Sequence, residues 1–115
     1  MSPEDVVRAE LSAWGRRNTE EIMSHFSTDV VWDNVPIGIA RGHDEIRKTV
    51  ENYLEHMTHM DIEIVNLAIA GNIVLTERVD HFVFDGKAVD ARCMGAFEIS
   101  GDRITAWRDY FDRNH

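Results

Sequence analysis

Apolar residues in the first half of the chain recur every three or four positions, which is the spacing of one face of a helix. The first stripe follows Ser2-Pro3-Glu4-Asp5, where a serine cap, an early proline and two acids favour a helix start. A short second helix is expected from Thr19 to near Phe26, and a third from Asp44 to His56. The residues predicted to face the core from the first and third helices are Val6, Val7, Leu11, Trp14, Ile46, Val50, Tyr53, Leu54 and Met57.

The second half of the chain alternates apolar and polar residues, which is the period of β-strands. One earlier strand is expected from Val30 to Val35, closed by Pro36, and Gly38–Gly42 is expected to be a loop. The later strands are predicted at Asp61–Ala70, Ile73–Phe84, Lys87–Ser100 and Arg103–Asp112. The breaks between them, Gly71-Asn72, Asp85-Gly86 and Gly101-Asp102, are typical of hairpin turns.

This order of elements predicts an α+β fold. We expect a curved, mixed, mostly antiparallel sheet wrapped around about three N-terminal helices. Such a sheet forms a cone, and its mouth is a natural interior pocket. At 115 residues, the whole of residues 1–115 is expected to be a single domain with one core.

Composition limits the possible partners and the compartment. A formal net charge of −9 argues against nucleic acid, whose phosphates require a basic surface. Neither a signal peptide nor an apolar run of membrane-spanning length is apparent, so we expect no membrane partner. A single cysteine, Cys93, rules out an internal disulfide and fits a reducing cytoplasm.

Candidate chemistry lies in two of the predicted strands. Arg78 and Asp80 share one face of their strand, and Asp109 shares a face with Trp107 and Phe111, which is typical of a protein interior. Buried carboxylates require a partner, and a guanidinium can bridge two of them. A structural ion pair is the alternative interpretation, because an isolated Arg-x-Asp on a strand is common.

Two ionised aspartates and one guanidinium leave an excess of one negative charge, so burial favours binding one proton. A carboxylic acid and a carboxylate then coexist, as simultaneous general acid and general base catalysis requires. Asn34, on the phase of Trp32 in the first strand, offers an amide donor and acceptor that could fix a water molecule.

These segments resemble the limonene epoxide hydrolases, a family within the nuclear-transport-factor-like, ketosteroid-isomerase-like and SnoaL-like cone fold. The matching pieces are Asn34-Val35-Pro36, Leu75-Thr76-Glu77-Arg78-Val79-Asp80 and the segment from Ile104 to Asp112. The resemblance covers essentially the whole chain. It implies one-step hydrolysis of an epoxide to a vicinal diol, with no metal, cofactor or covalent intermediate. It also implies a homodimer.

Carried over by position, the resemblance gives each residue a role. Asp109 is the general base that deprotonates a bound water, and Asp80 is the general acid that protonates the epoxide oxygen. Arg78 orients both carboxylates, and Asn34 helps to hold the water. The family has a tyrosine two residues before that asparagine, whereas this chain has Trp32, whose indole is a donor only. Trp32 is expected to donate to the same water.

Face parity also suggests the substrate pocket. The residues predicted to line it are Trp32, Val35, Leu75, Phe82, Met94, Trp107 and Phe111. Such a lining suits a small apolar or terpenoid-like epoxide, with water as the second substrate. We expect no metal: His56 and His59 are three apart, but no third ligand is evident nearby.

Three other functions are alternatives. An isomerase on this fold would use a single carboxylate base, for which Asp33 is the candidate. An epoxide-opening cyclase would use the same acid and base, with a hydroxyl of the substrate in place of water. A non-catalytic small-molecule binding module would retain the charged residues as a polar floor.

Overall fold

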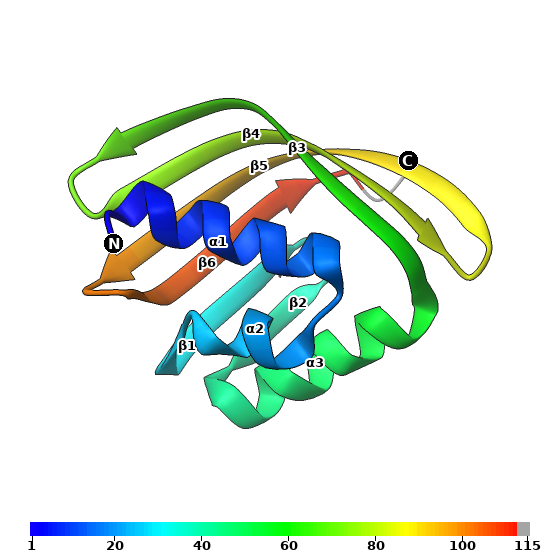
Figure 1. The fold of residues 1–115 in the computed structure, drawn as a ribbon, viewed down its shortest axis with the longest axis horizontal. Helices are drawn as coiled ribbons and strands as arrows, with labels where there is room; N and C mark the ends of the chain where they lie inside the picture. Colours follow the sequence, from blue (N-terminus) through cyan, green and yellow to red (C-terminus); the bar gives the residue numbers. More distant parts are fainter. Residues whose placement is uncertain (113–115) are drawn as a thin grey trace.

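The computed structural model describes residues 1–112 as three helices and six strands. The helices are α1 (Pro3–Arg16), α2 (Thr19–Ser24) and α3 (Gly42–His56). The strands are β1 (Phe26–Val35), β2 (Gly38–Arg41), β3 (Met57–Ala70), β4 (Ile73–Phe84), β5 (Lys87–Ser100) and β6 (Arg103–Phe111). All six strands form one sheet in the order β2-β1-β6-β5-β4-β3 (Figure 1).

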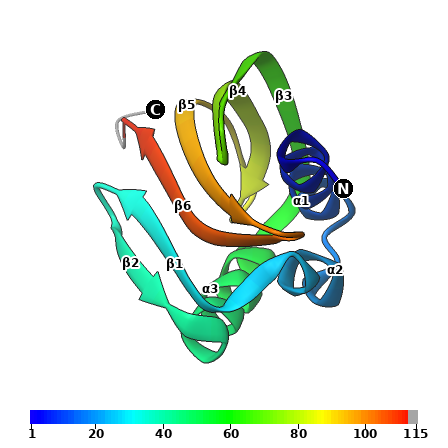
Figure 2. The same ribbon diagram turned by 90° about the vertical axis from the view of Figure 1, so that its left-hand side faces the viewer.

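The sheet is mixed and strongly curved. β1 and β6 run parallel, whereas every other neighbouring pair is antiparallel. Figure 2 shows the long strands bending around an interior, with α1 and α2 on one side and α3 below. The predicted α+β cone is therefore confirmed. The interior is the space between the helices and the concave face of the sheet.

α1 begins where the sequence predicts, because its first turn satisfies its own backbone donors. Ser2 accepts a hydrogen bond from the Asp5 amide, and the Asp5 side chain accepts one from the Ser2 amide, which completes a capping box. The helix ends at Arg16, and Arg17 follows in the left-handed conformation with φ of 55°. The buried stripe includes Val6, Val7, Leu11 and Trp14, as predicted.

Several predicted boundaries are wrong. Gly38–Gly42 is not a loop: Gly38–Arg41 forms the edge strand β2, and Gly42 begins α3. The four residues of β2 are mostly exposed and show no alternation, so only their pairing with β1 defines the strand. Phe26 opens β1, four residues before the predicted start. Met57 is buried, but it is the first residue of β3 rather than part of the third helix.

The core is continuous between the helices and the sheet. The completely buried residues from the helices include Val6, Ile22 and Val50, and those from the sheet include Phe97 and Ile104.

The longest described helix, α3, has 15 residues, and none of the three helices in residues 1–112 meets the length and hydropathy that a membrane span requires.

One carboxyl group lies inside this core. Glu10 on α1 has no exposed surface, and its Oε2 accepts a hydrogen bond from Trp14 Nε1 at 3.1 Å. Its Oε1 has no hydrogen-bond partner within residues 1–112. Burial is the main cause that raises the pKa of Glu10 well above its ordinary value. The folded protein therefore binds this proton more tightly than the unfolded chain does.

Glu10→Gln is expected to stabilise the protein in a pH-dependent way. Above the ordinary carboxyl pKa, unfolding releases the Glu10 proton, so the wild type loses stability as pH rises towards the folded-state pKa. The neutral amide has no such loss. We expect the variant to match the wild type near pH 4 and to exceed its unfolding free energy by about 1–3 kcal/mol at pH 8. Urea unfolding at both pH values measures this difference.

The matched control is Glu51→Gln on the exposed face of α3. This variant should leave the pH dependence of stability unchanged. If Glu10→Gln follows the wild type in parallel at every pH, Glu10 does not hold a proton in the folded protein.

Candidate active site

Arg78 is the centre of the site and is only 2% exposed. Its Nε and Nη2 donate to Asp80 Oδ1 and Oδ2 at 3.1 and 2.9 Å. Its Nη1 and Nη2 donate to Asp109 Oδ1 and Oδ2 at 3.0 and 2.9 Å. The guanidinium therefore bridges both carboxylates with two hydrogen bonds each, which is the arrangement that the alternation of the two strands suggested.

Sheet register explains how these distant residues meet. Arg78 on β4 pairs with Cys93 on β5, and Cys93 pairs with Phe111 on β6. Asp109 lies two residues before Phe111 on the same face, so the arginine side chain reaches it by crossing β5. On the other side of β6, Asn34 on β1 pairs directly with Asp109. The inner faces of β4, β6 and β1 thus converge at one end of the cone.

Asp109 receives a further donor that the sequence analysis missed. Trp107 Nε1 donates to Asp109 Oδ1 at 2.7 Å. Trp107 was predicted only as a pocket wall. The signal was present in the sequence, because residues two apart on a strand share a face. The carboxylate of Asp109 is therefore held by three N–H groups, whereas within residues 1–112 the carboxylate of Asp80 is held by Arg78 alone.

The site forms the floor of a cavity of about 390 Å³. Of the predicted lining residues, Trp32, Phe82, Trp107 and Phe111 contact this cavity. The helices and β3 contribute walls that the sequence analysis did not assign to it. These are Trp14, Tyr53, Met57, Met60 and Ile62.

Three of the residues predicted to line the cavity do not line it. Leu75 and Met94 are 43% and 54% exposed on the outer face of the sheet, and Val35 is also absent from the cavity lining. Each is a direct neighbour of an inward residue, Thr76, Cys93 or Asn34, so strand alternation turns it outward. Asp33, the base expected for an isomerase, is likewise next to Asn34 and does not line the cavity.

Trp32 lines the cavity, but its indole N–H is buried. Its ring stacks on Trp107 with centroids 4.9 Å apart. Trp14 and Tyr53 pack around it at centroid distances of 5.6 and 6.0 Å. The Trp32 Nε1 atom is buried and has no hydrogen-bond partner in the part of the chain that the structure describes. The indole N–H that was expected to donate to a bound water molecule is therefore not accessible to water in this structure.

The electrostatics of the site keep the guanidinium charged and the nearby neutral groups neutral. Burial lowers the pKa of Arg78, but Asp109 and Asp80 more than offset this, so the pKa is raised. Burial, followed by the charge of Asp109, raises the pKa of Tyr53 and that of the Cys93 thiol. Tyr53, which lines the cavity, therefore keeps its hydroxyl group neutral. The sequence predicts it only as a core-facing residue of the third helix.

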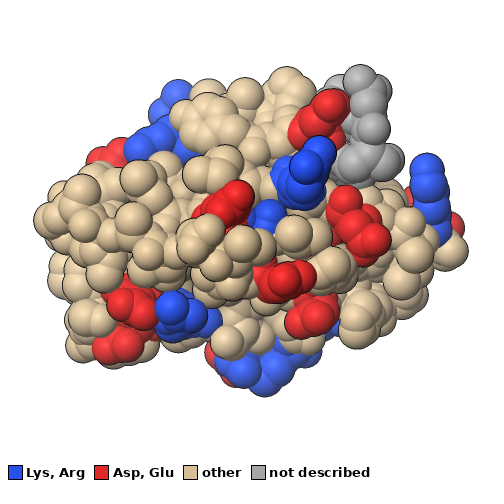
Figure 3. Space-filling view, turned by 90° about the horizontal axis from the view of Figure 1, so that it is seen from above, with Lys and Arg blue, Asp and Glu red and all other residues tan. Residues whose placement is uncertain are grey.

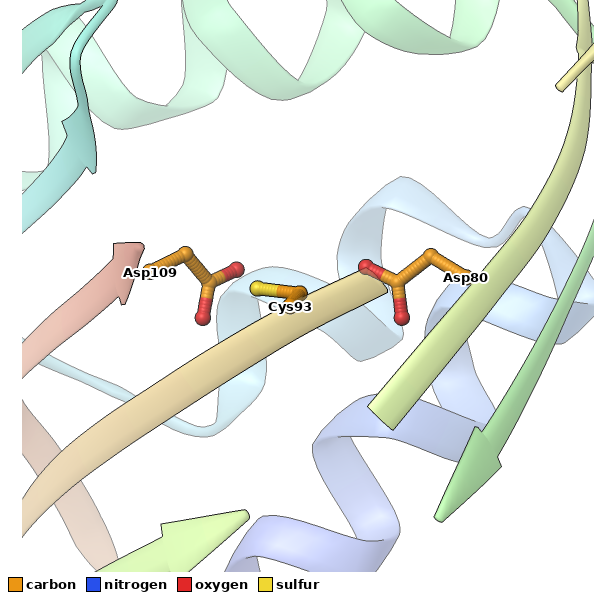
Figure 4. Close-up of side chains that lie close together, drawn as sticks. All are labelled: Asp80, Cys93 and Asp109. Atoms are coloured by element: carbon orange, nitrogen blue, oxygen red, sulfur yellow. The ribbon is translucent and has the colours of Figure 1, made fainter. Parts of the chain in front are cut away.

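Asp80, Cys93 and Asp109 bring three possible metal ligands within 4.8 Å of one another (Figure 4). The Arg78 guanidinium already lies against all three, and its Nη2 is 3.3 Å from the Cys93 sulfur. A metal ion would have to displace this fixed positive charge. The arrangement is therefore two carboxylates bridged by one arginine rather than an open set of metal ligands.

Comparison with known proteins gives consistent matches. The family model for the limonene-1,2-epoxide hydrolase catalytic domain matches residues 1–115. Epoxide hydrolase EphG of Mycobacterium tuberculosis is 30% identical over 106 residues, which cover 92% of this chain and 70% of that protein. A solved structure of an M. tuberculosis LEH-like epoxide hydrolase has a TM-score of 0.85 and 29% identity, covering 94% of this chain and 80% of the other.

More distant structures share the fold alone. A hypothetical protein with a ketosteroid isomerase-like fold from Catenulispora acidiphila has a TM-score of 0.87 at 22% identity, covering 98% of this chain and 88% of that one. A putative SnoaL-like polyketide cyclase from Shewanella denitrificans has a TM-score of 0.85 at 15% identity, covering 96% and 90%. Proteins described with different activities therefore share this cone.

Proposed function

The chain belongs to the limonene-1,2-epoxide hydrolase catalytic-domain family, and from this premise we propose that it hydrolyses an epoxide to a vicinal diol in one general acid/base step. The observation that carries the proposal is the Arg78 guanidinium, hydrogen-bonded to Asp80 and Asp109 on the floor of an apolar cavity. A protein that only bound an apolar ligand would have no need for one buried and one half-buried carboxylate held by a buried arginine.

In the proposed reaction, Asp109 accepts a proton from water as the water oxygen attacks an epoxide carbon. The carbon–oxygen bond of the ring breaks, and Asp80 gives its proton to the departing oxygen. Asp109 suits the base because three N–H groups hold it, two from Arg78 and one from Trp107. Asp80 suits the acid because it has fewer donors. The pair holds one proton before and after the step, and its return to Asp80 completes the cycle.

Asn34 lies beside the proposed base, because its strand position is paired with Asp109. Its amide can accept from a water molecule and donate to it, and so hold the water against Asp109. Trp32 is expected to shape the pocket here rather than to hold the water, because its N–H is buried. Each general catalyst contributes about 10²–10⁴-fold to such a reaction.

The cavity indicates the substrate class. Apart from the site itself, its walls are mostly aromatic and aliphatic side chains, among them Trp14, Met60, Phe82 and Phe84. No charged residue other than Arg78, Asp80 and Asp109 is among the cavity-lining residues described. We therefore propose a small apolar epoxide of the terpenoid type, without charged substituents.

Incubation with a panel of cyclic and terminal epoxides tests this function, with chiral chromatography of the diol as the readout. We expect turnover of apolar epoxides and a pH–rate profile with two limbs, from loss of the base at low pH and of the acid at high pH. Absence of diol across the whole panel, or a flat profile from pH 4 to 10, would contradict the proposal.

We also propose that the protein is a homodimer that uses the outer face of its sheet. Leu75, Met94 and Tyr110 are each more than 40% exposed there, and Met94 pairs with Tyr110 in the sheet. Figure 3, which views the molecule from above, shows uncharged areas between acidic and basic side chains on this side. Analytical ultracentrifugation should give twice the chain mass of 13.2 kDa. A single species of the chain mass at micromolar concentration would contradict the dimer.

A further inference from the structure

Gly95 lies on the inner face of β5, at the place where Arg78 reaches from β4 towards β6. It pairs with Thr76 on β4 and with Asp109 on β6. The inward residues of β5 along this crossing are all small: Ala91, Cys93 and Gly95 are each buried. The next inward residue, Phe97, is large and belongs to the core. The arginine side chain therefore crosses β5 over its smallest residues.

A side chain at Gly95 would occupy the space that the charged groups use. A Cβ atom there would lie 2.5 Å from Arg78 Nη1, 2.6 Å from Asp109 Oδ1 and 2.9 Å from Thr76 Oγ1. Arg78 Nη1 and Asp109 Oδ1 are the two atoms of one hydrogen bond, 3.0 Å long. A methyl group at Gly95 would thus occupy the position of the hydrogen bond between Arg78 and Asp109, the proposed base.

The backbone of Gly95 does not itself require glycine. Its φ is outside the positive range that disfavours other residues, unlike those of Gly71 and Gly101 in the turns. The nearest obstacles are also side-chain ends rather than backbone atoms. Alanine at this position can therefore be accommodated by the strand, but only if the guanidinium and the Asp109 carboxylate move. The expected damage is to the geometry of the site and not to the sheet.

We propose that Gly95 is a positioning residue for the acid/base pair: its missing side chain lets Arg78 cross β5 and hold Asp109 within hydrogen-bond distance. Thr76 supports the same arrangement, because its Oγ1 accepts from Arg78 Nη1 at 3.3 Å and lies near the Gly95 carbonyl oxygen. The catalytic consequence rests on the proposed hydrolase function, whereas the structural consequence does not.

Gly95→Ala tests the catalytic consequence. We expect kcat/KM for epoxide hydrolysis to fall about 100-fold, the loss associated with a displacement of about 1 Å, with most of the loss in kcat. The acidic limb of the pH–rate profile should move to higher pH, because the carboxylate that must stay ionised loses part of its positive neighbour. Gly15→Ala is the matched control, since a Cβ there meets only Met60 O at an ordinary 3.7 Å.

Thermal melting tests the structural consequence without any substrate. Arg78→Lys keeps a positive charge but lacks the Nη1 atom that the new methyl group would strike. Gly95→Ala should therefore lower the melting temperature less in the Arg78→Lys background than in the wild type. We expect the two decreases to differ by about 4 °C or more. This comparison remains informative if the wild type turns over no epoxide, so failure of the hydrolase proposal is distinguishable from failure of this one.

The proposal is overturned if Gly95→Ala has the kcat/KM and pH profile of the wild type. It is also overturned if the melting-temperature losses of Gly95→Ala and Arg78→Lys simply add. Additive losses would mean that Gly95 serves strand packing independently of the arginine.

Discussion

Asp109→Asn lowers kcat for epoxide hydrolysis by about 10²–10⁴-fold, the contribution of a general base, and leaves the affinity for an apolar ligand nearly unchanged. The amide has the size of the carboxylate but cannot take a proton from water. The cavity walls, which supply most of the binding surface, are untouched. Steady-state kinetics of diol formation, together with fluorescence titration of an unreactive apolar ligand against the tryptophans, measures both quantities.

The control for this substitution is Asp102→Asn in the β5–β6 turn, where the aspartate side chain is 59% exposed. It should retain full activity. The comparison also separates the enzyme from a binding module, because a binding module would show ligand affinity but no turnover in any variant. An Asp109→Asn protein that hydrolyses epoxide at the rate of the wild type would remove Asp109 from the reaction.

Arg78→Met is expected to give the largest loss of stability of any single substitution proposed. The guanidinium is buried, and its removal leaves two carboxylates facing each other without a cation. Breaking a buried ion pair in this way typically costs about 3–5 kcal/mol. Urea denaturation at pH 8 measures the loss. We expect it to be smaller at pH 5, because the unpaired carboxylates can then be neutralised by protons.

Arg47→Met is the matched control, because Arg47 pairs with Glu20 on the surface, where both side chains are at least 40% exposed. A surface pair contributes about 0–1 kcal/mol. Equal losses for the two arginines, or a loss at Arg78 that grows at acid pH, would show that Arg78 does not act as the buried positive charge between the two carboxylates.

Local patterns were enough to predict the strands that carry the site. Alternation and turn residues give β4, β5 and β6 within a few residues, and the same alternation turns Arg78, Asp80 and Asp109 inward. Edge strand β2 was missed because four mostly exposed residues have no periodic signal. Leu75 and Met94 were assigned to the wrong face: each is one residue from an inward residue, Thr76 or Cys93, so alternation turns it outward.

The remaining features depend on tertiary packing, which local periodicity does not encode. Trp14 and Tyr53 were predicted to face the core, but the position of α1 and α3 over the sheet decides that they wall the cavity. The space kept open by Gly95 depends on the register of three strands, β4, β5 and β6. The burial of the Trp32 N–H likewise results from rings contributed by α1, α3 and β6.

The central claim is that water attacks the epoxide directly while Arg78 holds Asp80 and Asp109 as acid and base. A single turnover in water enriched with oxygen-18, with enzyme in excess over epoxide, tests it most directly. Mass spectrometry of the diol and of the peptides that contain the two aspartates provides the readout. We expect one labelled oxygen in the diol from that first turnover and none in either aspartate. Unlabelled diol together with label in an aspartate side chain would instead establish a covalent ester intermediate and contradict the one-step reaction.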